Sequence, residues 1–345
     1  MIDETGASNP DMISRDARAH NALAEVRRAQ EKIGFIPEAP APIELESLPE
    51  LYRKSLFVEK LVRQQSEGQR IALFADIDQT FVLAGQEDTT ARLAAALDET
   101  NIPLAYVTGR GLDGVQRGDA PAPDIAITGV GTAIWVRSGD GVYQRDEAFN
   151  DLLAKDWNHD AVYALGEALI AEIEGLEFQD AYKPGRPVKD QFKISFNFSG
   201  NAEAAQAISE KLSASLTPLN AGAIISKNFR FPEGRYYVDF LPLVEGKLGK
   251  VLPIDHIRTM MGIKPITAGD SANDLDMLLS GEGPAILVGN AQSDVRSVIE
   301  EKIRQGASHF LLAENAGPQG IIEALEKGDF NPEMAAEFVK ATTSR

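Results

Sequence analysis

The chain has 345 residues, 43% of them hydrophobic and 25% charged, which is typical of a globular protein with one large domain or two ordinary ones. The absence of cysteine excludes disulfides, thiolate zinc sites and cysteine nucleophiles, and the four histidines are too scattered to predict a histidine metal site. With 34 basic and 52 acidic residues the net charge is −18, so neither nucleic acid nor an anionic membrane is an expected partner.

The N-terminal 69 residues are predicted to form a helical extension. Their first 20 residues are polar and acidic, unlike a secretory signal, and we therefore expect a cytoplasmic protein. The pattern predicts helices over 15–34 and 49–69, joined by a proline-rich turn. The second helix has too many apolar residues for a free helix in water, so it must pack on its own domain or on a second copy of the chain. These residues are Leu51, Leu56, Val58, Leu61 and Val62.

From residue 70 onward the pattern alternates between apolar strands and helices. A strand at 71–76, a helix at 89–101 and a strand at 102–109 are followed by two short strands around a glycine turn at 124–136. Apolar strands separated by helices are typical of a parallel, doubly wound α/β sheet. We assign residues 70–147 and 237–330 to this core.

The pattern changes between the two parts of the core. Residues 148–236 contain helices together with the alternating strand 191–199, which predicts an inserted α+β cap domain over the carboxyl ends of the core strands. The core pattern returns with a helix from about residue 246 and strands at 265–270 and 285–290. Residues 331–345 are left as a C-terminal tail.

Polar residues follow three of the predicted core strands. Asp76 and Asp78 follow the first strand, Thr108 and Gly109 the second, and Asp270 the strand at 265–270. Because ligands of an open parallel sheet bind at the carboxyl ends of its strands, these residues are expected to meet at one site. Two carboxylates so close together repel each other, which raises the pKa of one of them unless a cation lies between them.

Four motifs carry a resemblance to a known family: DIDQT (76–80), YVTGR (106–110), the pair Gly246-Lys247, and GDSANDLDML (269–278). The chain resembles the haloacid dehalogenase-like (HAD) phosphatases. Further stretches resemble the sucrose-phosphate phosphatase group, which has a type IIB cap, and extend the resemblance over about 70–328. They are DIAITGVGTAIW, QFKISFNF, VDFLP, VGNA and HFLLAENAGPQGIIEALE.

The resemblance implies roles for the acidic residues. Asp76 would attack phosphorus and form an aspartyl phosphate, while Asp78 would protonate the leaving alcohol and then accept a proton from water. One Mg²⁺ would be bound by the Asp76 carboxylate, the Asp78 backbone carbonyl and Asp270, with Asp274 in the metal site as a ligand or an orienting group.

The phosphate group needs a cation and hydrogen-bond donors in so acidic a protein. The Thr108 hydroxyl and the Gly109 N–H are expected to donate to phosphoryl oxygens, with Asn273 as a further donor. We expect Lys247 to be the counter-charge, rather than Lys250, because its spacing from VDFLP matches the family lysine. Arg110 either pairs with aspartates or faces the substrate.

The cap is expected to choose the substrate. Lys193, Ser195 and Asn197 alternate along one face of the strand 191–199, and in the sucrose-phosphate phosphatase group the corresponding stretch contacts the sugar. One alternative is an ordinary solvated strand face, and another is that Lys183, Arg186 and Lys189, just before the strand, contact the sugar instead.

The expected function is a Mg²⁺-dependent phosphatase that acts on a sugar phosphate, such as the disaccharide phosphate sucrose 6-phosphate. The alternatives are a sugar phosphomutase of the same superfamily and a non-catalytic sugar-binding or scaffold protein with the helical hairpin as a partner surface. Separately, the N-terminal helices are a candidate surface for homo-oligomer formation. A scaffold would not need both Asp76 and Asp78.

Overall fold

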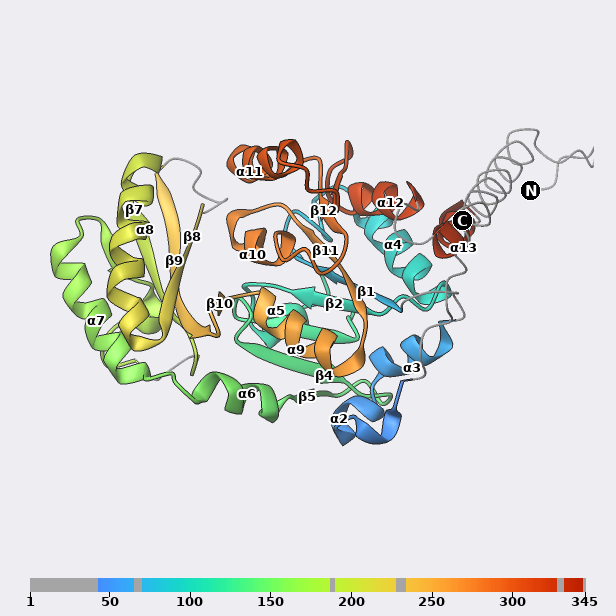
Figure 1. The fold of residues 1–345 in the computed structure, drawn as a ribbon, viewed down its shortest axis with the longest axis horizontal. Helices are drawn as coiled ribbons and strands as arrows, with labels where there is room; N and C mark the ends of the chain where they lie inside the picture. The colour runs from blue at the N-terminus through green and yellow to red at the C-terminus, as the bar shows by residue number, and fades with distance from the viewer. Residues whose placement is uncertain (1–42, 65–69, 187–189, 228–233, 328–331, 344–345) are drawn as a thin grey trace, which may run out of the picture.

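The computed structural model describes residues 43–64, 70–186, 190–227, 234–327 and 332–343. Figure 1 shows two bodies, one built on a large central sheet and one built on a smaller sheet, with helix α6 (Glu147–Ala154) running between them. The predicted helix over 15–34 lies outside the described residues.

The larger sheet has eight strands in the order β13-β12-β11-β1-β2-β3-β4-β5. The strands from β13 to β3 are parallel, and β4 and β5 are antiparallel additions at one edge. This arrangement confirms the predicted α/β core. The strands are β1 (Ile71–Ala75), β2 (Leu104–Val107), β3 (Ile125–Thr128), β4 (Ala133–Arg137), β5 (Tyr143–Arg145), β11 (Lys264–Gly269), β12 (Ala285–Leu287) and β13 (Phe310–Leu312).

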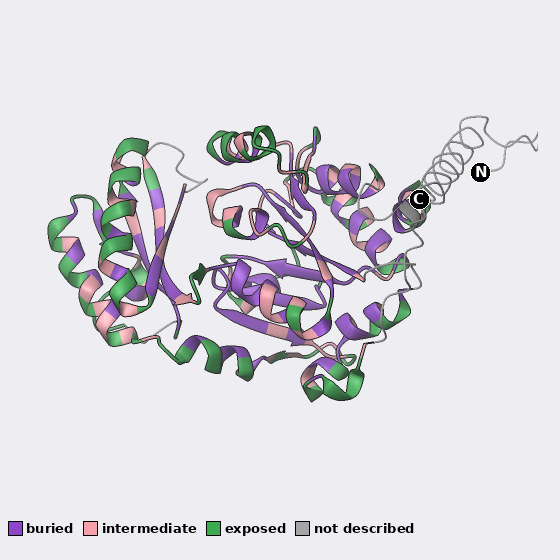
Figure 2. Ribbon diagram, viewed as in Figure 1, coloured by how far each residue is buried: buried purple, intermediate pink, exposed green. Residues whose placement is uncertain are grey.

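Helices cover both faces of this sheet, and the residues of β1 alternate between the two resulting cores. Phe74 packs in one core and Leu73 in the other, which is why β1 reads as an unbroken apolar run. One core includes α3 (Leu56–Arg63), α6, α9 (Val251–Met261), α10 (Leu275–Leu278) and α11 (Ser293–Arg304). The other includes α4 (Glu87–Glu99), α5 (Leu112–Val115), α12 (Gly317–Lys327) and α13 (Pro332–Thr343). Figure 2 shows the strands buried and the outer helix faces exposed.

The predicted C-terminal tail contains a packed helix. Helix α13 contacts α4 and α12, and its Phe338 is fully enclosed in the core that these helices form. The tail is therefore part of the larger body.

The smaller sheet is antiparallel, with strand order β10-β9-β7-β6 and β8 also paired to β9. Its strands are β6 (Leu176–Phe178), β7 (Ile194–Ser199), β8 (Ala221–Lys227), β9 (Arg235–Val244) and β10 (Lys247–Leu248). Helices α7 (His159–Glu172) and α8 (Ala202–Leu216) pack on it together with the 3₁₀ turns η2 (Asp180–Tyr182) and η3 (Thr217–Leu219). A Cβ atom on Gly166 of α7 would lie 2.6 Å from the Phe196 ring, so this glycine allows the helix to approach β7 closely.

The predicted end of the cap differs from the structure. A boundary at 236 falls inside β9, which continues to Val244 and turns back as β10. The helix expected from about residue 246 therefore begins only at Val251. Strand β10 (Lys247–Leu248) occupies the first residues that the sequence pattern assigned to the helix.

The N-terminal segment, residues 43–64, packs on the larger body. The helix predicted over 49–69 is interrupted: η1 (Leu45–Ser47) precedes α2 (Glu50–Arg53), and Ser55 then caps the separate helix α3 by accepting a hydrogen bond from the N–H of Val58. Phe57, Val58 and Leu61 are buried in the core. Of the two expected arrangements, packing on its own domain or on a second copy of the chain, the apolar face therefore adopts the first.

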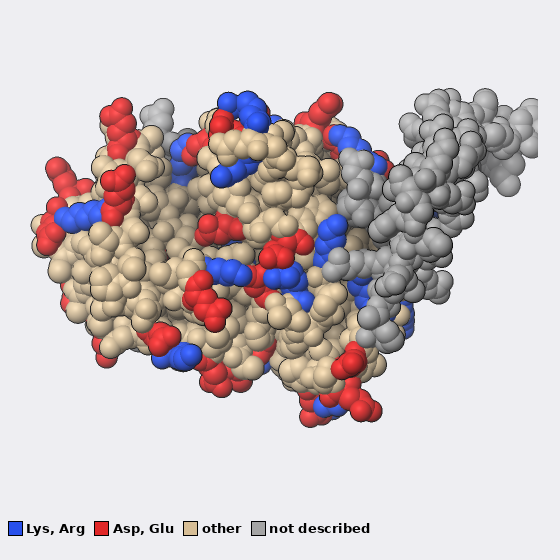
Figure 3. All heavy atoms as spheres, in the orientation of Figure 1, with Lys and Arg blue, Asp and Glu red and all other residues tan. Residues whose placement is uncertain are grey.

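In the part of the chain that the structure describes, no helix is both long enough and apolar enough to cross a membrane. On the face shown in Figure 3, acidic and basic side chains are interspersed.

Candidate active site

A tight turn after β1 presents the first acidic pair. The Asp76 N–H donates to the Ala268 carbonyl of β11, and the Asp76 carbonyl accepts from the N–H of Phe81, so the chain folds back directly after the strand. Gln79 lies in this turn with a left-handed φ of 66°. The Asp76 side chain is buried at the carboxyl end of β1, where the sequence predicted it.

A buried lysine lies against Asp76. The Lys250 Nζ donates to Asp76 Oδ1 at 2.7 Å and to Asp274 Oδ1 at 2.6 Å. Burial favours the neutral amine, but the two carboxylates outweigh it and raise the pKa of Lys250. Burial also raises the pKa of Asp76, and the Asp274 charge adds to this effect while Lys250 opposes it. The nucleophile candidate thus has a fixed positive partner.

The preference for Lys247 over Lys250 is corrected here. Lys247 lies in β10, its side chain is 47% exposed, and it forms an ion pair with Asp255 rather than with the acidic cluster. The Gly-Lys pair occurs twice, at 246–247 and at 249–250, and the β9–β10 hairpin uses the first pair. Gly249 has a φ of 67° and packs closely against Gly131: a Cβ on Gly131 would lie 2.4 Å from the Gly249 oxygen. Because the backbone at Gly249 comes this close, the next residue, Lys250, lies in the site.

Asp270 and Asp274 complete the acidic cluster. Asp270 follows β11, and its Oδ1 accepts a hydrogen bond from the Thr80 hydroxyl at 2.9 Å. Burial and repulsion from Asp274 and Asp76 raise the pKa of Asp270. One oxygen from each of Asp76, Asp270 and Asp274 lies within 4.8 Å of the others. The cluster can therefore hold a metal ion.

The carboxylate of Asp274 is already committed on both oxygens. Its Oδ1 accepts from Lys250, and its Oδ2 accepts from the backbone N–H groups of Asp270 and Ser271 at the start of η4 (Ala272–Asp274). A Cβ on Gly269 would lie 2.5 Å from the Asp274 Cβ, so glycine is needed for this contact. Asp274 is thus better placed to orient Lys250 than to bind a metal directly.

Asp78 is held by Arg110. The Arg110 Nε and Nη2 atoms donate to the two Asp78 oxygens at 2.9 and 2.7 Å, and Nη1 donates to Asp119. The hydrogen bond to Asp78 raises the pKa of Arg110. Of the two alternatives for Arg110, the structure favours pairing with aspartates.

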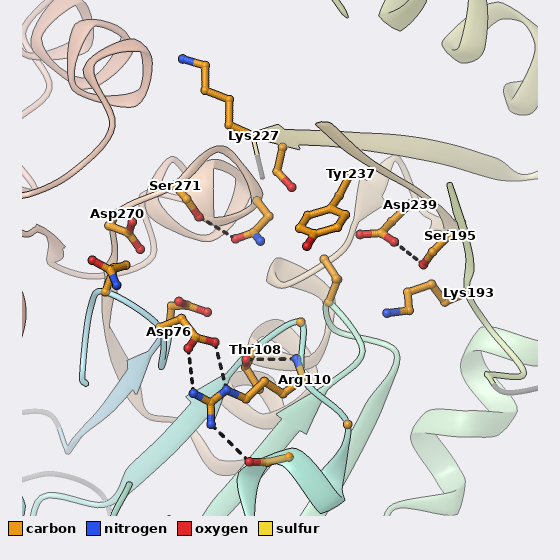
Figure 4. Close-up of a pocket in the computed structure, with 18 of the residues that line it drawn as sticks. Asp76, Thr108, Arg110, Lys193, Ser195, Lys227, Tyr237, Asp239, Asp270 and Ser271 are labelled. Carbon is orange, nitrogen blue, oxygen red and sulfur yellow. Dashed lines mark hydrogen bonds and ion pairs between the residues drawn. The ribbon is translucent and has the colours of Figure 1, made fainter. Parts of the chain in front are cut away.

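The predicted phosphate donors lie beside Asp76 in one cavity of about 480 Å³ (Figure 4). Thr108 Oγ1 accepts the Arg110 N–H, which leaves its own hydrogen available to a ligand. A Cβ on Gly109 would meet only Val130, at an ordinary 3.7 Å, so protein packing does not explain this glycine. Asn273 Oδ1 accepts from the Ser271 hydroxyl, which leaves the amide NH₂ free to donate.

The smaller sheet forms the opposite wall of this cavity. Lys193 and Ser195 line it as predicted, but Asn197 does not. Across the strands, Ser195 pairs with Asp239 and Asn197 pairs with Tyr237. Asp239 and Tyr237 of β9 line the cavity as well, and Asp239 accepts a hydrogen bond from the Ser195 hydroxyl. Sequence analysis missed both residues, although Asp239 lies in the VDFLP stretch that carried part of the resemblance.

Comparison with known proteins gives the family. The family model of sucrose-6F-phosphate phosphohydrolase matches residues 69–327, about three quarters of the chain. A HAD-like hydrolase of Nitrosococcus oceani is 29% identical over 264 residues, which are 73% of this chain and 68% of that protein. A sucrose-phosphatase of Arabidopsis thaliana is 25% identical over 239 residues, which are 63% of this chain and 52% of that protein.

Two further comparisons extend these results. Glucosylglycerol-phosphate synthase of Pseudomonas anguilliseptica is 27% identical over 256 residues, 73% of this chain and 30% of that protein. The chain therefore spans about half or less of this synthase and of the Arabidopsis protein. The crystal structure of the sucrose-phosphatase from Synechocystis sp. PCC6803, in complex with sucrose and phosphate, shares the fold. Its TM-score is 0.59 at 24% identity, over 76% of this chain and 99% of that one.

The family match covers the strands that present Asp76, Thr108 and Asp270 and the whole smaller sheet, so it includes both walls of the cavity. The chain belongs to the sucrose-6F-phosphate phosphohydrolase family of HAD phosphatases, and it is a phosphoric monoester hydrolase.

Proposed function

We propose that this phosphatase hydrolyses a sugar phosphate through an aspartyl phosphate on Asp76. The observation that carries the proposal is the position of the Asp76 carboxylate, which is buried against Lys250 and lines the same cavity as the polar residues of the smaller sheet. A substrate in this cavity has its phosphate at the nucleophile and its sugar against that second wall.

The reaction then proceeds in two steps. A carboxylate oxygen of Asp76 bonds to phosphorus as the bond to the sugar oxygen breaks, and Asp78 in its acid form gives that oxygen a proton. Asp78 then accepts a proton from water as the water oxygen attacks phosphorus, which releases inorganic phosphate and restores Asp76. Lys250, Thr108, Gly109 and Asn273 are proposed to hold the phosphoryl oxygens, and Asp274 to keep Lys250 in place.

Mg²⁺ is the proposed cofactor. Within the described residues, Asp76 Oδ2 and Asp270 Oδ2 have no hydrogen-bond partner, and an all-oxygen donor set of few carboxylates suits this ion. We propose that Asp76, Asp270 and the Asp78 carbonyl hold it. When bound, it would neutralise charge on the phosphoryl group.

The second wall supports a sugar as the leaving group. Lys193 and Asp239 are 8% and 7% exposed, so the wall offers a nearly buried ammonium and a nearly buried carboxylate. Sugar hydroxyls can accept from the first and donate to the second. The cavity volume of about 480 Å³ is in the range of small-molecule sites. With the family description and the sucrose bound in the Synechocystis enzyme, these features favour a disaccharide phosphate such as sucrose 6-phosphate.

The family assignment favours hydrolysis over the phosphomutase and scaffold alternatives. The direct test is phosphate release from a panel of mono- and disaccharide phosphates, with and without Mg²⁺. We expect the highest kcat/KM for a disaccharide phosphate and no turnover without a divalent ion. Preference for a small phosphate ester without a sugar would contradict the substrate assignment.

A further inference from the structure

Asp146 occupies the point where the chain leaves the large sheet for the smaller one. It follows β5, its N–H donates to the Ile134 carbonyl of β4, and its Oδ1 caps α6 by accepting from the N–H of Phe149. Helix α6 then leads to α7 of the smaller body (Figure 1). The Asp146 side chain is almost fully buried although it carries a carboxylate.

Two side chains from different parts of the chain meet the other oxygen of Asp146. The Tyr52 hydroxyl of α2 donates to Asp146 Oδ2 at 2.6 Å, and His256 Nε2 of α9 lies 3.1 Å from the same atom. Burial disfavours the Asp146 carboxylate, but these two contacts and the Phe149 N–H outweigh it and lower the pKa of Asp146. We refer to Tyr52, Asp146 and His256 as the hinge triad.

Helix α9 also contacts the chain where it returns from the smaller body. Asp255, the neighbour of His256, forms an ion pair with Lys247 of β10, and Lys250 at the start of the same helix contacts the nucleophile candidate. One helix thus touches the outgoing connection, the returning connection and the active site. Lys247 is half exposed, so its ion pair with Asp255 contributes little on its own, and the buried hinge triad is the stronger restraint.

Tyr52 lies outside the residues that the family model matches, 69–327. It is fully buried, and its segment is fixed to the larger body at other points as well. Lys60 donates to Asp124 at 2.8 Å, and the Gln64 side chain bonds both the N–H and the carbonyl of Ile71. The Tyr52 hydroxyl that bonds Asp146 therefore belongs to a segment that is anchored to the larger body at several points.

We propose that Tyr52 is a positioning residue: through the hinge triad, the N-terminal segment fixes the direction of α6 and so the placement of the sugar-contacting wall over Asp76. Loss of the hydroxyl leaves Asp146 with one partner fewer and allows α6 to change direction. Substrates that contact both walls should then bind less well, whereas a substrate that reaches only the phosphate site should be little affected.

The test compares Tyr52→Phe with Lys60→Met. Tyr52→Phe removes the hydrogen bond to Asp146, and Lys60→Met removes the ion pairs of the same segment to Asp98 and Asp124, so only the first variant touches the hinge triad. The substrates are p-nitrophenyl phosphate and the sugar phosphate for which the wild type has the highest kcat/KM. For Tyr52→Phe we expect KM for the sugar phosphate to rise about fivefold, the effect of one lost hydrogen bond, with a smaller change for p-nitrophenyl phosphate. Lys60→Met should lower Tm without this difference between substrates.

Amide hydrogen exchange adds a readout that needs no substrate. We expect faster exchange in residues 147–154 for Tyr52→Phe but not for Lys60→Met. His256→Leu approaches the same contact from α9 and should reproduce both the exchange and the KM effect, which covers the case in which Tyr52→Phe folds poorly. Equal KM values and equal exchange in the two segment variants would overturn the proposal. The kinetic part rests on the proposed sugar substrate, whereas the exchange result does not.

Discussion

The Nζ atom of Lys250 lies 2.7 Å from Oδ1 of Asp76, although 174 residues separate the two in the chain. Asp76 follows β1, and Lys250 follows the hairpin by which the chain returns from the smaller sheet. The same ammonium contacts Asp274, whose other oxygen accepts two backbone N–H groups. The Lys250 ammonium is thus held between the carboxylates of Asp76 and Asp274. Its positive charge offsets the repulsion that the crowded carboxylates would otherwise produce.

This relationship makes Lys250→Met and Lys247→Met a discriminating pair. Lys250→Met should lower kcat about 10²- to 10³-fold, because a positive group aimed at the phosphoryl oxygens is lost. Lys247→Met should keep kcat on p-nitrophenyl phosphate near the wild-type value, because Lys247 pairs with Asp255 outside the cavity. Steady-state kinetics measures both, and circular dichroism checks the fold of Lys250→Met, which removes the buried ion pairs to Asp76 and Asp274. A larger kcat loss in Lys247→Met would restore the original sequence assignment.

Asp76→Asn tests the nucleophile. The amide nitrogen or oxygen cannot attack phosphorus as a carboxylate does, so the variant should lose covalent phosphorylation and nearly all turnover. Acid-quenched protein from the wild type mixed with substrate should contain acyl phosphate, detectable by mass spectrometry, and the variant should contain none. Substantial metal-dependent turnover by Asp76→Asn would show that another group attacks phosphorus.

The sequence was sufficient for the acidic residues because the ends of apolar strands are visible in it. Asp76, Asp270 and Thr108 each end a strand of the larger sheet, and parallel strands bring their carboxyl ends to one edge. Lys250 could not be chosen in the same way. Two Gly-Lys pairs stand three residues apart, and only the length of the β9–β10 hairpin decides which of them enters the site.

Strand pairing explains the errors in the second wall. Alternation along β7 placed Lys193, Ser195 and Asn197 on one face, but it could not show how far along the strand the cavity extends. Asp239 was missed because it reaches the cavity through strand pairing. It lies in β9, directly opposite Ser195 of β7, and 44 residues separate the two in the chain. The break at Ser55 was missed because apolar spacing continues through it, while the serine side chain caps a new helix.

Lys193→Ala and Asp239→Asn test the second wall. Each removes a nearly buried charge that faces the proposed sugar, so each should raise KM for the sugar phosphate far more than for p-nitrophenyl phosphate. Asn197→Ala is the matched control, because it changes the same strand outside the cavity lining and should affect neither KM. An equal change for both substrates would place Lys193 and Asp239 outside the sugar site.

Removal of divalent ions with EDTA should abolish turnover, and added Mg²⁺ should restore it. Asp270→Asn should shift the Mg²⁺ concentration for half-maximal rate upward about tenfold or more, because the metal site loses the charge of one of the two carboxylates that keep an oxygen without a hydrogen-bond partner. Thr80→Val is a milder probe of the same site, since its hydroxyl donates to Asp270 Oδ1. Full activity of the EDTA-treated enzyme would contradict the metal assignment.

Deletion of residues 1–67 tests how far the N-terminal segment serves stability rather than chemistry. The deletion uncovers the core surface against which Tyr52, Phe57 and Leu61 pack, and each such side chain stabilises the fold by about 1.5–3 kcal/mol when buried. The sum is a large part of the roughly 5–15 kcal/mol by which a domain is stable, so we expect a much lower Tm and poor solubility. Deletion of residues 1–42 is the control, because it leaves all three side chains in the chain. The segment contacts the amino ends of β1 and β3, because Gln64 bonds Ile71 and Lys60 bonds Asp124 just before β3; these ends are opposite to the edge that bears Asp76. Any soluble protein from the longer deletion should therefore keep kcat on p-nitrophenyl phosphate within a small factor. A well-folded truncated protein with kcat reduced by orders of magnitude would show that the segment takes part in the chemistry.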